Sequence, residues 1–175
     1  MSVSYIIYNS NQATVAAPVK QPTGNTIRTM MQLRFATGVH AKIKRWGCSF
    51  DASAAGVPGQ VELFENTAAA TMTTAYAAAD VMPYNDRSAT ANTAGSSGAP
   101  LNLSTTTSGF ATAAVTEGTV AGYRGIDLQM IAPTNQYIYD WPLSDEFDIT
   151  PQNYIRVRVT FAVSVNMYIY IIFEV

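Results

Sequence analysis

The fold class is decided by the stretch NYIRVRVTFAVSVNMYIYIIFEV, which runs from Asn153 to Val175. In its first half, apolar residues occupy every second position (Ile155, Val157, Val159, Phe161 and Val163). The same spacing returns in its second half (Met167, Ile169, Ile171, Phe173 and Val175). A period of two is typical of a strand, because successive side chains point to opposite faces of a sheet. The short polar turn between the two runs therefore predicts a C-terminal antiparallel β-hairpin.

Further segments along the chain predict short strands separated by turn residues. They are residues 4–8, 26–35, 41–50, 60–64, 70–78, 110–115, 124–130 and 136–141. Eight to ten such strands predict an all-β, antiparallel β-sandwich that is jelly-roll-like. Residues 26–35 and 70–78 are also compatible with helices, and the imperfect alternation of residues 41–50 indicates a bulge near Gly47.

The 175 residues predict a single domain, because all-β domains of this size commonly remain undivided. Two segments lack a strand period. A polar, Ala-rich arm covers residues 9–22, and a loop rich in Asn, Ser, Thr, Gly and Ala covers residues 83–108. Neither offers enough large apolar groups to offset its own ordering entropy. We expect both to be flexible and to become ordered on a partner.

The composition restricts the partners that the surface can take. Charged residues make up 13% of the chain, where about 25% is usual, and the net charge is −2. Such a surface gives no electrostatic reason to expect nucleic acid, which needs a basic face. No apolar run approaches the roughly 20 residues of a membrane helix, so no membrane partner is expected. The low charge favours a surface that is partly covered by other subunits.

The N-terminus and the cysteine content indicate where the chain is made. Residues 1–5 lack the basic and apolar regions of a signal peptide, so we expect synthesis in the cytosol. Cys48 is the single cysteine and lies in an apolar strand, which is typical of a small buried hydrophobic residue.

A search for catalytic residues, metal ligands and cofactor motifs finds none that we assign. His40 is the single histidine, and no Gly-x-Ser-x-Gly motif accompanies it. The densest acidic group, Asp145 to Asp148, is more typical of a solvated turn than of a calcium site. Glu62 and Glu65 are the carboxylates that a glycoside hydrolase would need, but their spacing alone does not place them across a cleft. We therefore expect a chain without enzymatic activity.

The candidate interface residues lie opposite the predicted core face of the C-terminal strands. Tyr168, Tyr170 and Ile172 would form an apolar outer face, which favours burial against another subunit. The alternative is a strand that is buried on both faces within its own subunit. Both interpretations remain open from the sequence.

Two groups of basic residues complete the candidate set. Arg156 and Arg158 share the outer side of their strand, where they face solvent or the acidic loop at residues 145–148 of a neighbouring subunit. Lys42, Lys44 and Arg45 form a basic cluster beside a tryptophan. Stacking on nucleic acid is conceivable there, but lysines on the solvent side of an edge strand are the more ordinary interpretation.

The overall layout resembles a known class of virion proteins. The resemblance is carried by YIIYNSNQAT (Tyr5 to Thr14), IRTMMQL (Ile27 to Leu33), WGCSFD (Trp46 to Asp51), VELFE (Val61 to Glu65), MIAPT (Met130 to Thr134) and WPL (Trp141 to Leu143). These segments, followed by the C-terminal strands, are similar to the small β-rich proteins that decorate or cement the heads of tailed bacteriophages. The likeness covers most of the chain but contains no diagnostic motif.

This resemblance implies a fold, an assembly and a location. Proteins of this class are jelly rolls or sandwiches that sit as homotrimers on the capsid exterior, where they clamp subunits of the major capsid protein. It therefore implies a capsid decoration protein without a cofactor or active site. A tail or neck component of the virion and a jelly-roll carbohydrate-binding module are the alternatives.

Overall fold

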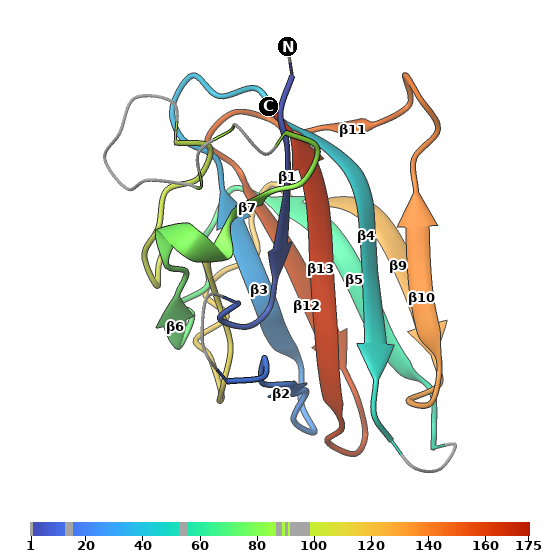
Figure 1. The fold of residues 1–175 in the computed structure, drawn as a ribbon. Coiled ribbons are helices and arrows are strands. Elements are labelled where there is room, and N and C mark those ends of the chain that lie inside the picture. Colours follow the sequence, from blue (N-terminus) through green and yellow to red (C-terminus); the bar gives the residue numbers. More distant parts are fainter. Residues whose placement is uncertain (1, 13–15, 53–55, 87–88, 90, 92–98) are drawn as a thin grey trace.

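The computed structural model describes residues 2–12, 16–52, 56–86, 89, 91 and 99–175. Two antiparallel sheets pack face to face, which confirms the expected all-β sandwich (Figure 1). In the described residues, sheet A has the order β10 (Gln136–Asp140), β4 (Lys42–Phe50), β13 (Asn166–Glu174), β1 (Ser4–Tyr8) and β7 (Met82–Pro83), with β11 (Phe147–Asp148) on β4 and β2 (Gln21–Pro22) on β13. Sheet B has the order β6 (Thr74–Ala75), β8 (Gly109–Phe110), β3 (Arg28–Arg34), β12 (Tyr154–Thr160), β5 (Gly59–Asn66) and β9 (Arg124–Ile131). One 3₁₀ turn, η1 (Ala78–Asp80), joins β6 to β7.

The predicted C-terminal hairpin is wrong, because β12 and β13 belong to opposite sheets. β12 pairs with β3 and β5, whereas β13 pairs with β1 and β4. The connection between them crosses from sheet B to sheet A, so their apolar sides face each other through the core. The alternation of apolar residues is the same in a hairpin and in such an arch, and the five residues between the strands leave room for the crossing.

Arches of this kind organise the whole sandwich. β1 and β3, β4 and β5, and β9 and β10 each place one strand in either sheet, as β12 and β13 do. The four pairs stand side by side, and the β12–β13 pair lies between the β1–β3 pair and the β4–β5 pair (Figure 1). This passage of the chain between two sheets builds the expected sandwich, and its jelly-roll-like character stays a prediction.

The core lies between the sheets and contains the predicted alternate residues of both C-terminal strands. Val159 and Ile169 are buried, as expected. The helix that residues 26–35 would allow is absent, since Arg28–Arg34 is a strand with a buried apolar side. Val163 is an exception to the predicted inward face. It lies beyond the end of β12 and is 73% exposed, because the arch has already turned away from the core there.

Several predicted segments are shorter or differently placed than expected. Strand structure covers only two residues of 70–78 and ends at Phe110 in the segment 110–115. The bulge in β4 lies at Lys44, where Arg45 opposes Ile172 and Ile43 opposes Phe173. It was expected near Gly47, which is instead paired regularly with Tyr170.

The described parts of the arm and of the long loop are tied into the sandwich. Asn9 is buried and its side-chain oxygen accepts a hydrogen bond of 2.7 Å from the Ile169 amide. Gln21 is also buried, at the start of β2. In the loop, Leu101 bridges to Phe35 and is buried. The expectation that the middle of each segment is flexible falls on residues 13–15, 87–88, 90 and 92–98, which lie outside the described residues.

Candidate functional site

The residues considered for catalysis do not form a common site. His40 is exposed in the connection that precedes β4. Cys48 is buried, and burial raises the pKa of its thiol to about 12, which keeps it protonated and unreactive near neutral pH. Among the described residues, no group of three or more His, Cys, Asp or Glu side chains is arranged to hold a metal ion.

Glu62 and Glu65 point to opposite faces of β5 and are both occupied by ion pairs. Glu62 lies on the outer face of sheet B and pairs with Arg158. Glu65 lies at the core side, where its Oε2 pairs with Arg124 and its Oε1 accepts hydrogen bonds from Thr150 and Asn153. The two carboxylates therefore cannot face one another across a cleft, as glycoside hydrolysis requires.

The outer face of sheet B is covered over β12, and this overturns the expectation that Arg156 is a surface residue. Arg156 is 0% exposed. The chain between β8 and β9 crosses above it, and Glu117 from that segment forms an ion pair with the guanidinium. Arg156 also donates a 2.7 Å hydrogen bond to the Thr29 hydroxyl, and Thr29 donates a 2.6 Å bond to Glu117.

Burial lowers the pKa of Arg156, while the Glu117 carboxylate acts in the opposite direction. The guanidinium lies 5.2 Å from the centre of the Phe64 ring, and that of Arg158 lies 4.8 Å from it. Arg156 thus holds the cover on sheet B, whereas Arg158 is paired within the sheet with Glu62 of β5, and neither is free to meet the acidic loop of a neighbouring subunit.

The basic cluster also differs from its predicted setting, because β4 is not an edge strand. It lies between β13 and β10. Lys44 donates a 2.7 Å hydrogen bond to Glu174, and Arg45 pairs with Asp140. Lys42 is exposed next to them. Paired in this way, two of the three cations are neutralised within the fold, and the expectation of no nucleic-acid partner stays a prediction.

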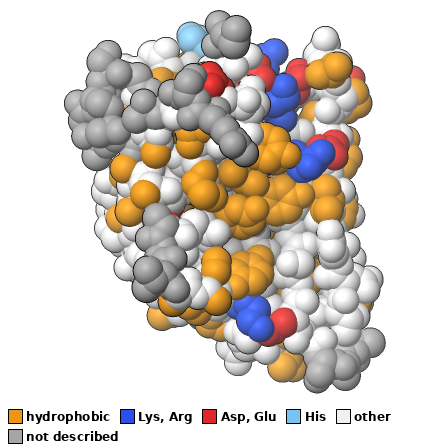
Figure 2. Space-filling model, viewed as in Figure 1, with side chains coloured by type: hydrophobic (Ala, Val, Ile, Leu, Met, Phe, Trp, Pro, Cys, Tyr) orange, Lys and Arg blue, Asp and Glu red, His pale blue; other side chains and the backbone are white. Residues whose placement is uncertain are grey.

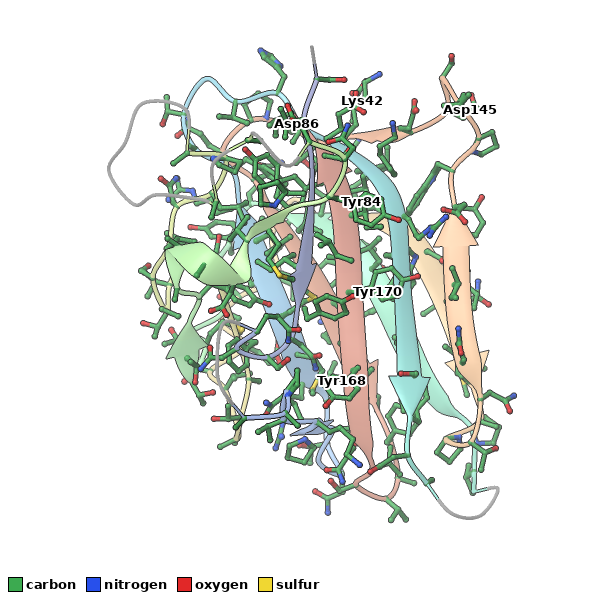
Figure 3. All side chains as sticks on the ribbon, in the orientation of Figure 1. Lys42, Tyr84, Asp86, Asp145, Tyr168 and Tyr170 are labelled. Atoms are coloured by element: carbon green, nitrogen blue, oxygen red, sulfur yellow. The ribbon has the colours of Figure 1, made fainter. Side chains whose placement is uncertain are left out.

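The outer face of sheet A remains as the candidate site. We call it the aromatic face and define it by Ile6, Tyr8, Tyr84, Ile138, Tyr168 and Tyr170. Figure 2 shows an apolar patch over the centre of this face, with basic and acidic side chains adjacent to each other at its margin. Figure 3 shows Tyr168 and Tyr170 along β13, with Tyr84 reaching across from the segment that follows β7.

Of the three residues expected on this face, Tyr168 and Tyr170 are half-buried and lie on it. Ile172 is only 5% exposed and is flanked by Ile6 and Arg45 on the neighbouring strands, so it is not an interface residue. Both open interpretations of β13 thus apply to different parts of the strand. The end of β13 at Ile172 is buried within the subunit, and the part that carries Tyr168 and Tyr170 is accessible.

A glycine shapes the middle of the aromatic face. A Cβ atom at Gly47 would lie 2.8 Å from the Tyr170 ring and 2.7 Å from the Tyr137 carbonyl oxygen. The absence of a side chain therefore lets the Tyr170 ring lie against the backbone of β4. Burial raises the pKa of the Tyr170 hydroxyl. Tyr8 lies beside this ring at a tilt of 45°, with 6.0 Å between the ring centres.

A pocket of about 420 Å³ opens beside these rings. Tyr170 and Tyr168 form one wall, Ile138 and Gln136 form the opposite wall, and Ser49 of β4 lies between them. The hydroxyl of Tyr168 donates a hydrogen bond to the Pro18 carbonyl, which fixes that ring at the rim. The pocket thus offers aromatic rings, amides and hydroxyls, but no charged group.

Sequence reasoning identified two of the six residues of this face. Ile6 and Tyr8 were missed because β1 alternates too briefly to show an outer side, and Tyr84 was missed because it lies outside a strand. Ile138 was missed because the sheet order, which brings β10 next to β4, is not visible in the chain order.

No protein-family model matches the chain, and neither a curated protein nor a solved structure is significantly similar to it. Within the part of the chain that is described, no helix has the length and hydropathy needed to cross a membrane.

Proposed function

We propose that the chain is a non-enzymatic virion structural protein that decorates a bacteriophage capsid and stabilises it by bridging major capsid protein subunits. The single observation that carries this proposal is the aromatic face. Tyr84 and Ile138 are well exposed on it, beside the half-buried Tyr8 and Tyr170. An accessible group of aromatic and aliphatic side chains on a sheet face is typical of a protein interface.

The charges around the aromatic face favour a protein partner. Arg45 is paired with Asp140 on one margin, and Lys20 is paired with Asp51 at 2.5 Å on another. A face whose charges neutralise one another offers nothing to a polyanion, but it can be buried against another apolar surface without leaving unpaired ions. A chain that bridges two capsid subunits engages two linked sites at once, so two weak contacts would give a stronger overall attachment.

The experiment asks whether the chain is part of the particle and whether the aromatic face holds it there. Particles of the phage that encodes it, purified on a density gradient, should contain the chain, and particles made without it should rupture at a lower temperature. Purified chain should rebind to those deficient particles. The variants Tyr84→Lys and Ile138→Lys should lose rebinding, whereas Val57→Lys, which changes an even more exposed apolar residue elsewhere, should retain it. Absence of the chain from purified particles would overturn the proposal.

A second candidate function, carbohydrate binding, is favoured by the pocket beside Tyr170. The electron-rich face of a tyrosine ring attracts the polarised C–H groups of a sugar, and the amides of Gln12 and Gln136 can bond its hydroxyls. Binding of neutral oligosaccharides to the wild-type chain, lost in Tyr170→Ala and retained in Tyr84→Lys, would select this candidate. A glycan array without any signal would exclude it.

A further inference from the structure

The two sides of the sandwich, where its sheets end, differ in how they are protected. On one side, sheet A ends in β7 and sheet B ends in β6, and each strand has only two residues. β7 also ends in Pro83, which lacks the N–H group that would pair with another strand. Very short edge strands and prolines are common protections against unwanted strand pairing. We call this the closed side.

On the opposite side, sheet B ends in β9 with eight residues and sheet A ends in β10 with five. Within the described residues, each pairs with one neighbour only, β9 with β5 and β10 with β4. Neither strand contains a proline or a lysine. We call this the open side. It presents two long edges, one in each sheet, with unpaired backbone groups along them.

Exposed apolar side chains are concentrated along the open side. Twelve large apolar residues are exposed in the described part of the chain, and seven of them lie between Val120 and Leu143. Leu128 and Met130, on the outer side of β9, are 58% and 67% exposed. A long edge strand with such side chains is a site for pairing with another chain.

The charged groups of the strands β9 and β10 themselves are already occupied and would not repel a second copy, with Asp140 of β10 paired to Arg45. Arg124 pairs with Glu65 and donates a 2.7 Å hydrogen bond to the Asp148 carbonyl. Asp127 points between the sheets, where it accepts hydrogen bonds from Trp46 at 3.0 Å and Tyr137 at 2.6 Å. The bulge in the β9–β5 pairing lies beside Leu63, so the half of β9 from Asp127 onwards is regular.

We propose that two copies of this chain associate through their open sides, with β9 pairing antiparallel to β9 of the second copy about a two-fold axis. Because the sheets are stacked, an axis perpendicular to them also brings β10 towards its own copy, so that both sheets continue across the interface. Strand pairing by β9 alone buries less than the roughly 800 Å² per partner of a standard interface. The contribution of β10, with the exposed Tyr139, is therefore part of the proposal.

The antiparallel arrangement suits the pattern of β9. Leu128 and Met130 are two residues apart and share one face. A register that places Leu128 opposite the second copy's Met130 gathers four apolar side chains on that face, and it sets no like charges opposite each other. The same two-fold symmetry makes the interface self-complementary, as is usual in homodimers.

The test compares the mass of the chain in solution with that of edge variants. Sedimentation equilibrium from about 1 to 100 µM should give twice 18.9 kDa for the wild-type chain. The double variant Leu128→Lys/Met130→Lys places four lysines across the axis and should weaken association by about 100-fold or more. The matched control is Val19→Lys/Ile27→Lys, which adds the same charge at residues of similar exposure (66% and 50%) away from the open side and should remain dimeric.

Two further measurements keep the outcome decisive. Circular dichroism shows that a monomeric edge variant is still folded. Hydrogen exchange of the wild-type chain should show protection of the β9 amides that increases with protein concentration. A wild-type chain of 18.9 kDa throughout the concentration range would overturn the proposal. A trimer, or any oligomer that Leu128→Lys/Met130→Lys leaves unchanged, would overturn it too. The edge variants Leu128→Lys/Met130→Lys lie on β9 and leave all six residues of the aromatic face unchanged, so they test association separately from capsid binding.

Discussion

The two outer faces of the sandwich differ in solvent accessibility, and in the opposite way to what the polarity of their side chains suggests. The outer face of sheet B carries charged residues, among them Arg156 and Glu62, yet these are buried. The outer face of sheet A carries tyrosines and isoleucines, among them Tyr84 and Ile138, which remain exposed. The polarity of a strand's outer side thus shows which residues point away from the core, but not whether solvent reaches them.

The difference comes from one long connection. β5 and β9 are neighbours in sheet B, but more than fifty residues connect them. This connection leaves the sheet and returns across its outer face. There it supplies partners for the buried polar groups. Gln32, for example, donates to the Ala70 carbonyl and accepts from the Ala70 amide. A polar face can be covered stably only when each group gains such a partner.

The largest effect should come from removing the carboxylate that neutralises the buried Arg156. Glu117→Ala leaves the guanidinium buried without its ion pair, which should cost about 3–5 kcal/mol of unfolding free energy in urea titration. Arg156→Met keeps an apolar chain of similar length without the charge and should cost less. The pair on the other face, Lys20–Asp51, is exposed, so Asp51→Ala should change stability little. Equal, small losses in all three variants would mean that the cover does not depend on this ion pair.

A smaller effect should come from adding a methyl group under the aromatic face. In Gly47→Ala, the new Cβ meets the Tyr170 ring and the Tyr137 carbonyl, and we expect a loss of about 1–3 kcal/mol from overpacking. Adding Tyr170→Ala to the Gly47→Ala variant should relieve part of the overpacking. The substitution removes the clash with the ring, whereas the close contact with the Tyr137 carbonyl remains. Ser49→Ala, two residues along the same strand, is the control. A Gly47→Ala chain as stable as wild type would show that Tyr170 does not lie against β4.

The smallest effect concerns the ion pair at the margin of the aromatic face. The hydrogen bond from Lys44 lowers the pKa of Glu174 below its usual value. A lowered pKa in the folded chain stabilises it above the unfolded-state pKa, and this contribution is lost as pH falls through the folded-state value. Both side chains are partly exposed, so Glu174→Gln should cost only about 0.2–1 kcal/mol at neutral pH. In thermal melts from pH 7 to pH 3, the melting temperatures of the variant and the wild type should converge. A difference in melting temperature that stays constant would contradict the assignment of this pH dependence to Glu174.

The strands could be predicted from the sequence, but their arrangement could not. The alternation in residues 153–175 predicted two strands and identified core residues such as Val159 and Ile169. It could not separate a hairpin from an arch, because both place alternate residues on a common interior. That choice depends on which neighbours flank each strand, and those neighbours are 88 or more residues away.

Only part of the candidate site could be predicted, because contacts between residues that are far apart in the sequence are again not visible in it. Tyr168 and Tyr170 stand in a long alternating run, so their outward direction could be read from the pattern. The role of Gly47 depends on its pairing with Tyr170, a contact between β4 and β13. The burial of Arg156 depends on Glu117, which belongs to a segment without any strand period.

The order of strands in space has a consequence for synthesis. β12 and β13 are the last of the described strands to leave the ribosome, yet β13 separates β4 from β1 and β12 separates β5 from β3. Until they emerge, the nascent polypeptide holds two incomplete half-sandwiches with open ladders and uncovered apolar residues. Insertion of the final arch closes both sheets at once, so the sandwich cannot be completed before β13 has emerged. In that interval the chain is most exposed to aggregation and most in need of a chaperone.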